Sequence, residues 1–384
     1  MRHDELRIDI DGVEAADLYA DLLGLEVELD EELAGMFRMT LALLLRPDGS
    51  WTYLDDERLM VWRRVQVTAG LQDDVQPLLT GYITHVRPDF GPGLEACRLQ
   101  VWGTDASVLM DRVERLKDWP NKKDSDIATE TFQAYGLTPQ VTDTGIVHDE
   151  AVSTVIQRET DIQLLRRLAL RNGFECFVDG DRGYFRPPAV DDTPQPVLAV
   201  HFGEETNVNR FSLEVDALAP TDVAMFQIDH IAGDVLEAHA VPGSQTALGA
   251  VPAAGVLGPG MGPGLVYVAQ SVATGVPEMT EICQSVYDQA EWLVTGEGEV
   301  AANEYGSILR PRSTVTVKGV GATHSGVYYV AHVTHRFTLD GYLQTFRIKR
   351  NALASKGDED FSTGGADAAA GLPAAGALAA EVSL

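Results

Sequence analysis

The sequence has few cysteines and no long apolar run. Its 384 residues include three cysteines, Cys97, Cys176 and Cys283, which lie far apart and lack metal-ligand spacing. We therefore expect reduced, buried thiols, and neither a disulfide framework nor a zinc site. No segment approaches the roughly 18 apolar residues of a membrane span. The chain is accordingly predicted to be made in the cytoplasm and not to be embedded in a membrane.

Basic residues are also scarce relative to acidic ones. The chain has 29 Lys and Arg residues against 58 Asp and Glu residues, a formal net charge of -29. This surplus repels a phosphate backbone unless basic residues cluster, and short runs such as Arg63-Arg64 and Lys122-Lys123 are too small to form such a cluster. Direct, sequence-specific binding of nucleic acid is therefore not expected. Hydrophobic residues make up 45% of the chain, which is ordinary for a globular protein with its own cores.

The common hydrolase motifs are missing. The sequence has no Gly-x-Ser-x-Gly nucleophile elbow and no His-Glu-x-x-His helix. Two carboxylate pairs, Asp73-Asp74 and Asp191-Asp192, could serve a glycoside hydrolase, but their polar, turn-like contexts favour solvated loops. We predict no catalytic residue and no cofactor site.

Three histidines near the C-terminal end invite a metal interpretation, namely His324, His332 and His335. On a strand, residues three positions apart point to opposite faces, so His332 and His335 do not readily share one ion. No metal site is predicted.

The most informative feature is a pattern that occurs twice. It is Tyr82-x-x-His85-Val86-x-x-x-Phe90 in one place and Tyr329-x-x-His332-Val333-x-x-x-Phe337 in the other. An alternating strand precedes each copy, with Val65-x-Val67 before the first and Val315-x-Val317 before the second. Internal similarity of this extent predicts a duplicated β-domain. The candidate interface residues are Tyr82, His85, Val86, Phe90, Tyr329, His332, Val333 and Phe337, for which plain core packing is the alternative.

Between the copies, helix signals interrupt the strand pattern. Ser125-Asp126 and Gly136 bracket one short helix, whereas Thr160 or Asp161 and Gly173 bracket a second with one apolar face. A hairpin turning at Asp179-Gly180 follows. We also expect a helix from Pro277 or Glu278 through Leu293, ending near Gly296, and read Gly319-Val320-Gly321 as a hairpin turn.

Several of these motifs together resemble a known family. The segment from Gln157 to Phe174 (QRETDIQLLRRLALRNGF) is similar to the helix-and-hairpin signature of phage late control gene D proteins. These are tail hubs that are similar to the hub part of VgrG proteins. Gly81-Tyr82-Ile83 through Gly103-Thr104-Asp105-Ala106 resembles the family's first barrel, and Leu309-Arg310-Pro311 through Val330 resembles its second. VgrG chains continue into a needle-like β-helix, whereas this sequence has only a short low-complexity segment after Asn351.

The expected fold class is mainly β with α+β inserts: two similar tube-like β-barrel domains plus a small helix-and-hairpin domain. The predicted division is 1–118 for the first hub barrel, 119–195 for the small α+β insert, 196–264 for a β-rich connecting region with a Pro/Gly linker, 265–352 for the second hub barrel with a preceding helix, and 353–384 for a disordered Ala/Gly-rich tail.

The resemblance implies a non-enzymatic homotrimer that joins a hexameric inner tube, or a tube adaptor ring, to a separate central spike protein. Other baseplate subunits are further expected partners. Such a protein is part of a phage tail, a virion or an extracellular injection particle. Two alternatives stay open at this point, a tail-associated cell-wall hydrolase and a carbohydrate-binding module.

Overall fold

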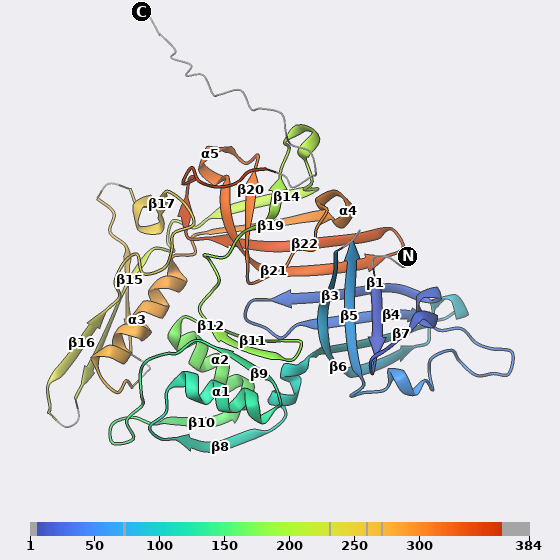
Figure 1. Cartoon of the computed structure of the whole chain (residues 1–384), viewed down its shortest axis with the longest axis horizontal. Helices are drawn as coiled ribbons and strands as arrows, with labels where there is room; N and C mark the ends of the chain where they lie inside the picture. The colour runs from blue at the N-terminus through green and yellow to red at the C-terminus, as the bar shows by residue number, and fades with distance from the viewer. Residues whose placement is uncertain (1–5, 72–73, 230–231, 259, 270–271, 363–384) are drawn as a thin grey trace, which may run out of the picture.

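One large sheet runs through most of the molecule (Figure 1). The computed structural model describes residues 6–71, 74–229, 232–258, 260–269 and 272–362. The sheet has thirteen strands: β1 Leu6–Ile10, β2 Val13–Glu14, β3 Leu22–Asp30, β4 Met36–Ala42, β5 Arg64–Leu71, β6 Asp74–Asp89, β7 Arg98–Asp105, β13 Gln195–Ala199, β14 Arg210–Val215, β19 Val294–Ala301, β20 Thr314–Lys318, β21 Gly326–Thr338 and β22 Gly341–Arg350.

The sheet has two halves, and each half packs around its own hydrophobic core. Alternation creates these cores, because buried and half-buried side chains succeed one another along β7. The first core is built on β1 and β3 to β7, and the second on β13 and β19 to β22. The prediction of a mainly β fold with α+β inserts is confirmed. The two tube-like barrels of that prediction are instead two similar halves of one sheet. Among the described strands, neither half closes into a complete ring.

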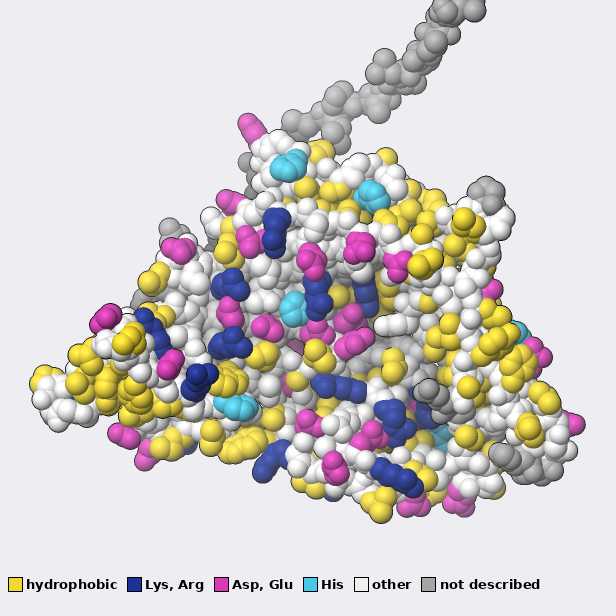
Figure 2. Space-filling view, turned by 180° about the vertical axis from the view of Figure 1, so that it is seen from behind, with side chains coloured by type: hydrophobic (Ala, Val, Ile, Leu, Met, Phe, Trp, Pro, Cys, Tyr) yellow, Lys and Arg dark blue, Asp and Glu magenta, His cyan; other side chains and the backbone are white. Residues whose placement is uncertain are grey.

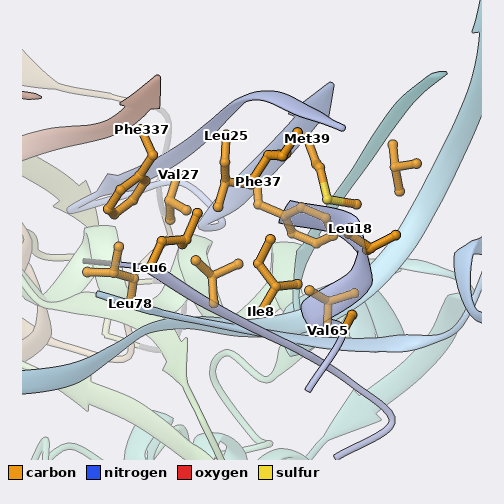
Figure 3. Packing of buried hydrophobic residues seen from close by; sticks show 14 of the residues in the cluster. Leu6, Ile8, Leu18, Leu25, Val27, Phe37, Met39, Val65, Leu78 and Phe337 are labelled. Carbon is orange, nitrogen blue, oxygen red and sulfur yellow. The ribbon is translucent and has the colours of Figure 1, made fainter. Parts of the chain in front are cut away.

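The two cores are not independent. Phe337, at the end of β21, lies beside Leu25 and Val27 of β3 in the first core (Figure 3). Its side chain is only 1% exposed, and its ring stacks on Tyr342 of β22 with centroids 4.2 Å apart. The C-terminal half of the sheet therefore contributes side chains to the N-terminal core.

A small α+β unit follows the first half of the sheet, as expected. Its elements are β8 Glu114–Trp119, α1 Asp124–Ala134, β9 Thr138–Val141, β10 Val155–Thr160, α2 Asp161–Asn172, β11 Glu175–Asp179 and β12 Arg182–Arg186. Thr160 caps α2 with Gln163 in a capping box, and Gly173 ends the helix in a left-handed conformation with φ of 65°. The apolar face of α2 packs on α1 and β11 in a third core.

A second inserted unit lies between β14 and β19. It contains β15 Thr221–Ile228, β16 Val235–His239, β17 Val251–Pro252, β18 Gly264–Val268 and α3 Val276–Ala290. Helix α3 ends before the predicted Leu293, because Leu293 instead packs in the second core where β19 begins. The predicted turn at Gly319-Val320-Gly321 leads into one helical turn, α5 Gly321–His324, before β21 begins. Two other short elements are α4 Ala302–Tyr305 and β23 Ala352–Leu353, which pairs with β17.

Charged side chains of both signs are interspersed over the face shown in Figure 2, and the basic ones do not merge into one patch there. Of the helices that the structure describes, none has the length and apolar character needed to cross a membrane. The predicted disordered tail falls mainly on residues 363–384, which lie outside the described residues.

Candidate assembly interface

The repeated sequence pattern belongs to a repeated five-stranded module. In the first copy the strand order is β3-β4-β7-β6-β5, and in the second it is β14-β19-β22-β21-β20. All neighbouring strands are antiparallel, and the strands follow one another along the chain in the same order. The inserted unit between β14 and β19 is the main difference. The duplication predicted from two hairpins therefore extends to the whole module.

The irregularities of the two copies also match. A β-bulge skips Thr84 in the pairing of β6 with β7, and another skips Ala331 in the pairing of β21 with β22. Each bulged residue directly precedes the histidine of the repeated pattern. A bulge bends its strand and increases the local twist, so the same bend occurs in both modules.

A left-handed residue occupies equivalent positions in both modules. Trp62 has φ of 70° and Arg312 has φ of 61°. Trp62 lies three residues before Val65 of β5, and Arg312 lies three residues before Val315 of β20. The N–H of Trp62 donates to the carbonyl of Ile83 at 2.7 Å, and the N–H of Arg312 donates to Val330 at 2.9 Å. Such a conformation is uncommon in residues other than glycine, so its recurrence supports a common origin of the modules.

The second half of β21 joins the two modules. Before the bulge β21 pairs with β20, and after the bulge it pairs with β3 of the first copy, from His332 opposite Asp30 to Thr338 opposite Gly24. We call this strand pair the copy junction. Nδ1 of His332 lies 3.0 Å from Oδ2 of Asp30, and an ion pair joins Arg336 to Glu26 at 2.8 Å.

The Asp30 carboxylate is held in its charged form. Burial opposes ionisation, but the hydrogen bond with His332 and those from the backbone N–H groups of Glu32 and Leu33 outweigh it. The pKa of Asp30 is therefore well below its ordinary value. Arg347 adds a further contact, with Nη2 3.2 Å from Oδ2.

His335, by contrast, is a buried neutral residue of the junction. Its side chain is fully buried, with Nδ1 2.8 Å from the hydroxyl oxygen of Tyr342. Burial lowers its pKa well below the ordinary value. Among the described residues there is no group of three His, Cys, Asp or Glu side chains that could hold a metal ion.

The eight predicted interface residues differ in exposure between the two copies. In the second copy Tyr329, Val333 and Phe337 are buried, and His332 is half-buried at the copy junction. Tyr329 donates a hydrogen bond from its hydroxyl to Glu175 of β11. These four residues thus contact other parts of the same chain.

In the first copy the equivalent residues face outward. Val86 is 36% and Phe90 is 53% exposed. His85 is also exposed and stacks on Trp102 with ring centroids 5.0 Å apart, while Tyr82 is half-buried. Phe90 contacts Trp51 edge-on at 5.2 Å. The sequence pattern marked both copies alike. The pairing of β21 with β3 distinguishes His332, Val333 and Phe337 from their first-copy equivalents, and the hydrogen bond to Glu175 distinguishes Tyr329.

Arg312 fixes the α+β unit against both modules. Its guanidinium lies 3.8 Å from the ring centroid of Phe177 in β11 and donates to the carbonyl of Asp30. Burial lowers its pKa, although the buried carboxylates Glu175 and Asp105 oppose that effect. No local sequence pattern marks Arg312, because Phe177 and Asp30 are more than 130 positions away from it.

A buried ionic network holds α3 against the α+β unit. Nε2 of His148 lies 2.9 Å from Asp124 of α1, and Nδ1 lies 3.5 Å from Glu278 of α3. Arg171 of α2 contacts both carboxylates. Burial lowers the pKa of His148, but its two carboxylate partners outweigh burial and raise the pKa to about 9. This imidazole is therefore protonated at neutral pH.

Of the two carboxylate pairs considered for hydrolysis, Asp191-Asp192 is the one that lies wholly among the described residues. Asp191 and Asp192 lie in an exposed turn. Asp360, on the same hollow of the surface, has its pKa lowered by hydrogen bonds from Ser362, whereas a general acid requires a raised one. Asp73 lies outside the described residues.

A family model described as the Alg8 N-terminal domain matches residues 36–338, more than three quarters of the chain. No curated protein matches the chain.

Solved structures of similar shape come from tail and secretion machines. The 43 kDa tail protein of prophage MuSo2 from Shewanella oneidensis is 14% identical with a TM-score of 0.65, and the match covers 91% of this chain and 99% of that one. A tail protein from Neisseria meningitidis MC58 is 14% identical with a TM-score of 0.60, with coverage of 90% and 96%. The E. coli c3393 protein, a component of the type VI secretion system, is 13% identical with a TM-score of 0.51, with coverage of 89% and 76%. At these identities the similarity establishes a shared fold.

Proposed function

The chain belongs to the Alg8 N-terminal domain family, and we propose that it is a structural hub of a contractile tail or phage-like injection system. In this proposal three chains assemble through their sheets, so that two modules from each chain give six similar modules in one ring. Such a ring matches a hexameric inner tube, or a tube adaptor ring, on one side and a threefold spike on the other.

One observation carries the proposal, the repetition of a complete five-stranded module within one chain. The two copies share strand order, bulge position and the left-handed residue that precedes β5 in one copy and β20 in the other. A single chain that presents two similar surfaces allows a threefold assembly to meet a sixfold one. The shared fold with tail proteins from Shewanella and Neisseria supports the same role.

The proposal implies several partners. They are two further copies of the chain, the tube protein or its adaptor ring, a separate spike protein and other baseplate subunits. The net charge of -29 would keep a channel or a large assembly from binding acidic cargo. The role requires neither catalysis nor a cofactor, and places the protein in a phage tail, a virion or an extracellular injection particle.

The mass of the purified chain in solution tests the proposal. Light scattering is expected to give three chains of 41.6 kDa, about 125 kDa in total. A protein that stays monomeric at all concentrations, also with its tube and spike partners added, would contradict the hub. Clearing of peptidoglycan in a zymogram would instead favour a hydrolase, and saccharide affinity in a monomer would favour a carbohydrate-binding module.

A further inference from the structure

Two of the unpaired strand edges in the described part of the large sheet concern the two modules. β6 pairs with β5 as far as Tyr82, and beyond the bulge at Thr84 its residues 85–89 pair with β7 on one side only. β14 pairs with β19 and ends the sheet. No other described strand pairs with either edge.

These are the same two edges that meet inside the chain at the copy junction. β21 is the second-copy equivalent of β6, and its part beyond the bulge pairs with β3. β3 is in turn the first-copy equivalent of β14, because each is the first strand of its module. Each chain therefore forms this strand pair once internally, between β21 and β3. The equivalent strands β6 and β14 each keep the corresponding edge unpaired.

We infer that residues 85–90 of one chain pair antiparallel with β14 of a second copy of the chain, in the register of the copy junction. This inference rests on the proposed trimer and names the contact that would build it. Transferring the register residue by residue gives the following pairs: His85 with Asp216, Val86 with Val215, Arg87 with Glu214, Pro88 with Leu213, Asp89 with Ser212 and Phe90 with Phe211.

Charge complementarity supports this register. It places His85 opposite Asp216, which repeats the pair of His332 with Asp30. Arg87 then faces Glu214, a pair of opposite charge. A register shifted by one residue would lose both matches and would also turn each side chain to the other face of the sheet.

Asp216 also has the local geometry of Asp30. Oδ1 of Asp30 accepts a hydrogen bond from the N–H two residues later, that of Glu32, at 3.0 Å. Oδ1 of Asp216 accepts from Leu218, again two residues later, at 2.8 Å. In both copies the strand thus ends in the same side-chain turn, which holds the carboxylate at the strand end where the histidine is expected.

Apolar exposure marks the same segments. In β14, Val215 is 38% exposed, whereas its equivalent Leu29 at the copy junction is 7% exposed. Directly after β6, Phe90 is 53% exposed, whereas its equivalent Phe337 is 1% exposed. An open strand edge with exposed apolar side chains is a liability in a free monomer, and pairing between chains removes it.

A disulfide between chains tests the pairing at residue level. Directly opposed residues of antiparallel strands have Cα atoms about 4.5–5.5 Å apart, within the range that a disulfide spans. The variant carries Val86→Cys and Val215→Cys in the full chain. The three native cysteines are buried and so interfere little with mild oxidation. The matched control combines Val215→Cys with Val75→Cys, which is 64% exposed on the part of β6 that pairs with β5.

We expect the Val86/Val215 variant to form cross-linked dimers and trimers on denaturing gels after mild oxidation, and the control and single variants to remain uncross-linked. A trimer by light scattering without the Val86/Val215 cross-link would overturn the pairing and leave the hub intact. Cross-linking into species larger than three chains would support the pairing and overturn the closed trimer. A monomer without cross-links would overturn both.

Discussion

His332 and Asp30, which are 302 positions apart in the sequence, face each other across the strand pair that joins the two modules, with Nδ1 and Oδ2 3.0 Å apart. Asp30 also accepts backbone hydrogen bonds at the end of β3. The contact therefore fixes the register of the copy junction, and its counterpart in the open edges is His85 with Asp216.

Replacing Asp30 or Asp216 separates the contact within the chain from the inferred contact between chains. Asp30→Asn removes the charge that His332 and Arg347 contact, and we expect the free energy of unfolding to fall by about 2 kcal/mol. Chemical unfolding followed by tryptophan fluorescence measures this loss, at dilutions where the midpoint no longer depends on protein concentration. Asp216→Asn is the matched control. It should change that value by less than about 0.5 kcal/mol but weaken the trimer. Equal loss in both variants would contradict this division.

Phe337 and Phe90 occupy equivalent positions in the two modules and allow a second comparison. Phe337→Ala leaves a cavity in the first core, so we expect a loss of about 3–5 kcal/mol of folding stability. Phe90→Ala removes an exposed ring that contacts Trp51, and the same unfolding assay should show a loss below about 1 kcal/mol. Its main effect should be on the mass of the assembly. If Phe90→Ala unfolded the chain as severely as Phe337→Ala, the two copies would not differ as described.

The charge pair of the inferred contact can be exchanged. Arg87→Glu places two acidic residues opposite each other, and Glu214→Arg places two basic ones, so each single variant should shift the protein from trimer towards monomer. The double variant restores opposite charges and should regain the trimer. Sedimentation velocity at low salt measures the change. A double variant no better than the singles would argue against Arg87 facing Glu214.

The network around His148 predicts a loss of stability in alkaline solution. The folded-state pKa of about 9 lies above the ordinary value of 6.5. The corresponding stabilisation is fully present below about pH 6.5 and is lost as the pH rises through 9, and it amounts to at most about 3 kcal/mol. Unfolding midpoints between pH 6 and pH 10 should show this decline. His148→Gln should flatten it, whereas His239→Gln, which alters an exposed histidine, should not. An unchanged slope in His148→Gln would contradict the assignment.

The sequence was informative where the signal is local. The ends of α2 follow from Thr160 and Gly173, whose capping roles depend on a few neighbouring residues. The hairpins of both modules follow from alternation and from the repeated Tyr, His and Phe positions. The bulges at Thr84 and Ala331 carry no glycine signal, so the pattern did not reveal them.

The sequence did not predict which strands of the sheet pair with each other. β3 and β14 are equivalent strands, yet beyond alternation their segments from Leu25 and from Phe211 share only a glutamate and the aspartate at the strand end. Whether a strand edge pairs within the chain depends on contacts between residues hundreds of positions apart. For this reason His332 and His85, identical in the sequence pattern, have different surroundings in the structure.

End-on images of the purified particle test the central claim most directly. Averaged negative-stain views of the full chain should show a closed ring with six lobes and threefold symmetry, because each of three chains contributes two similar but unequal modules. Single compact particles with two lobes, or rings with a number of lobes that is not six, would contradict the account.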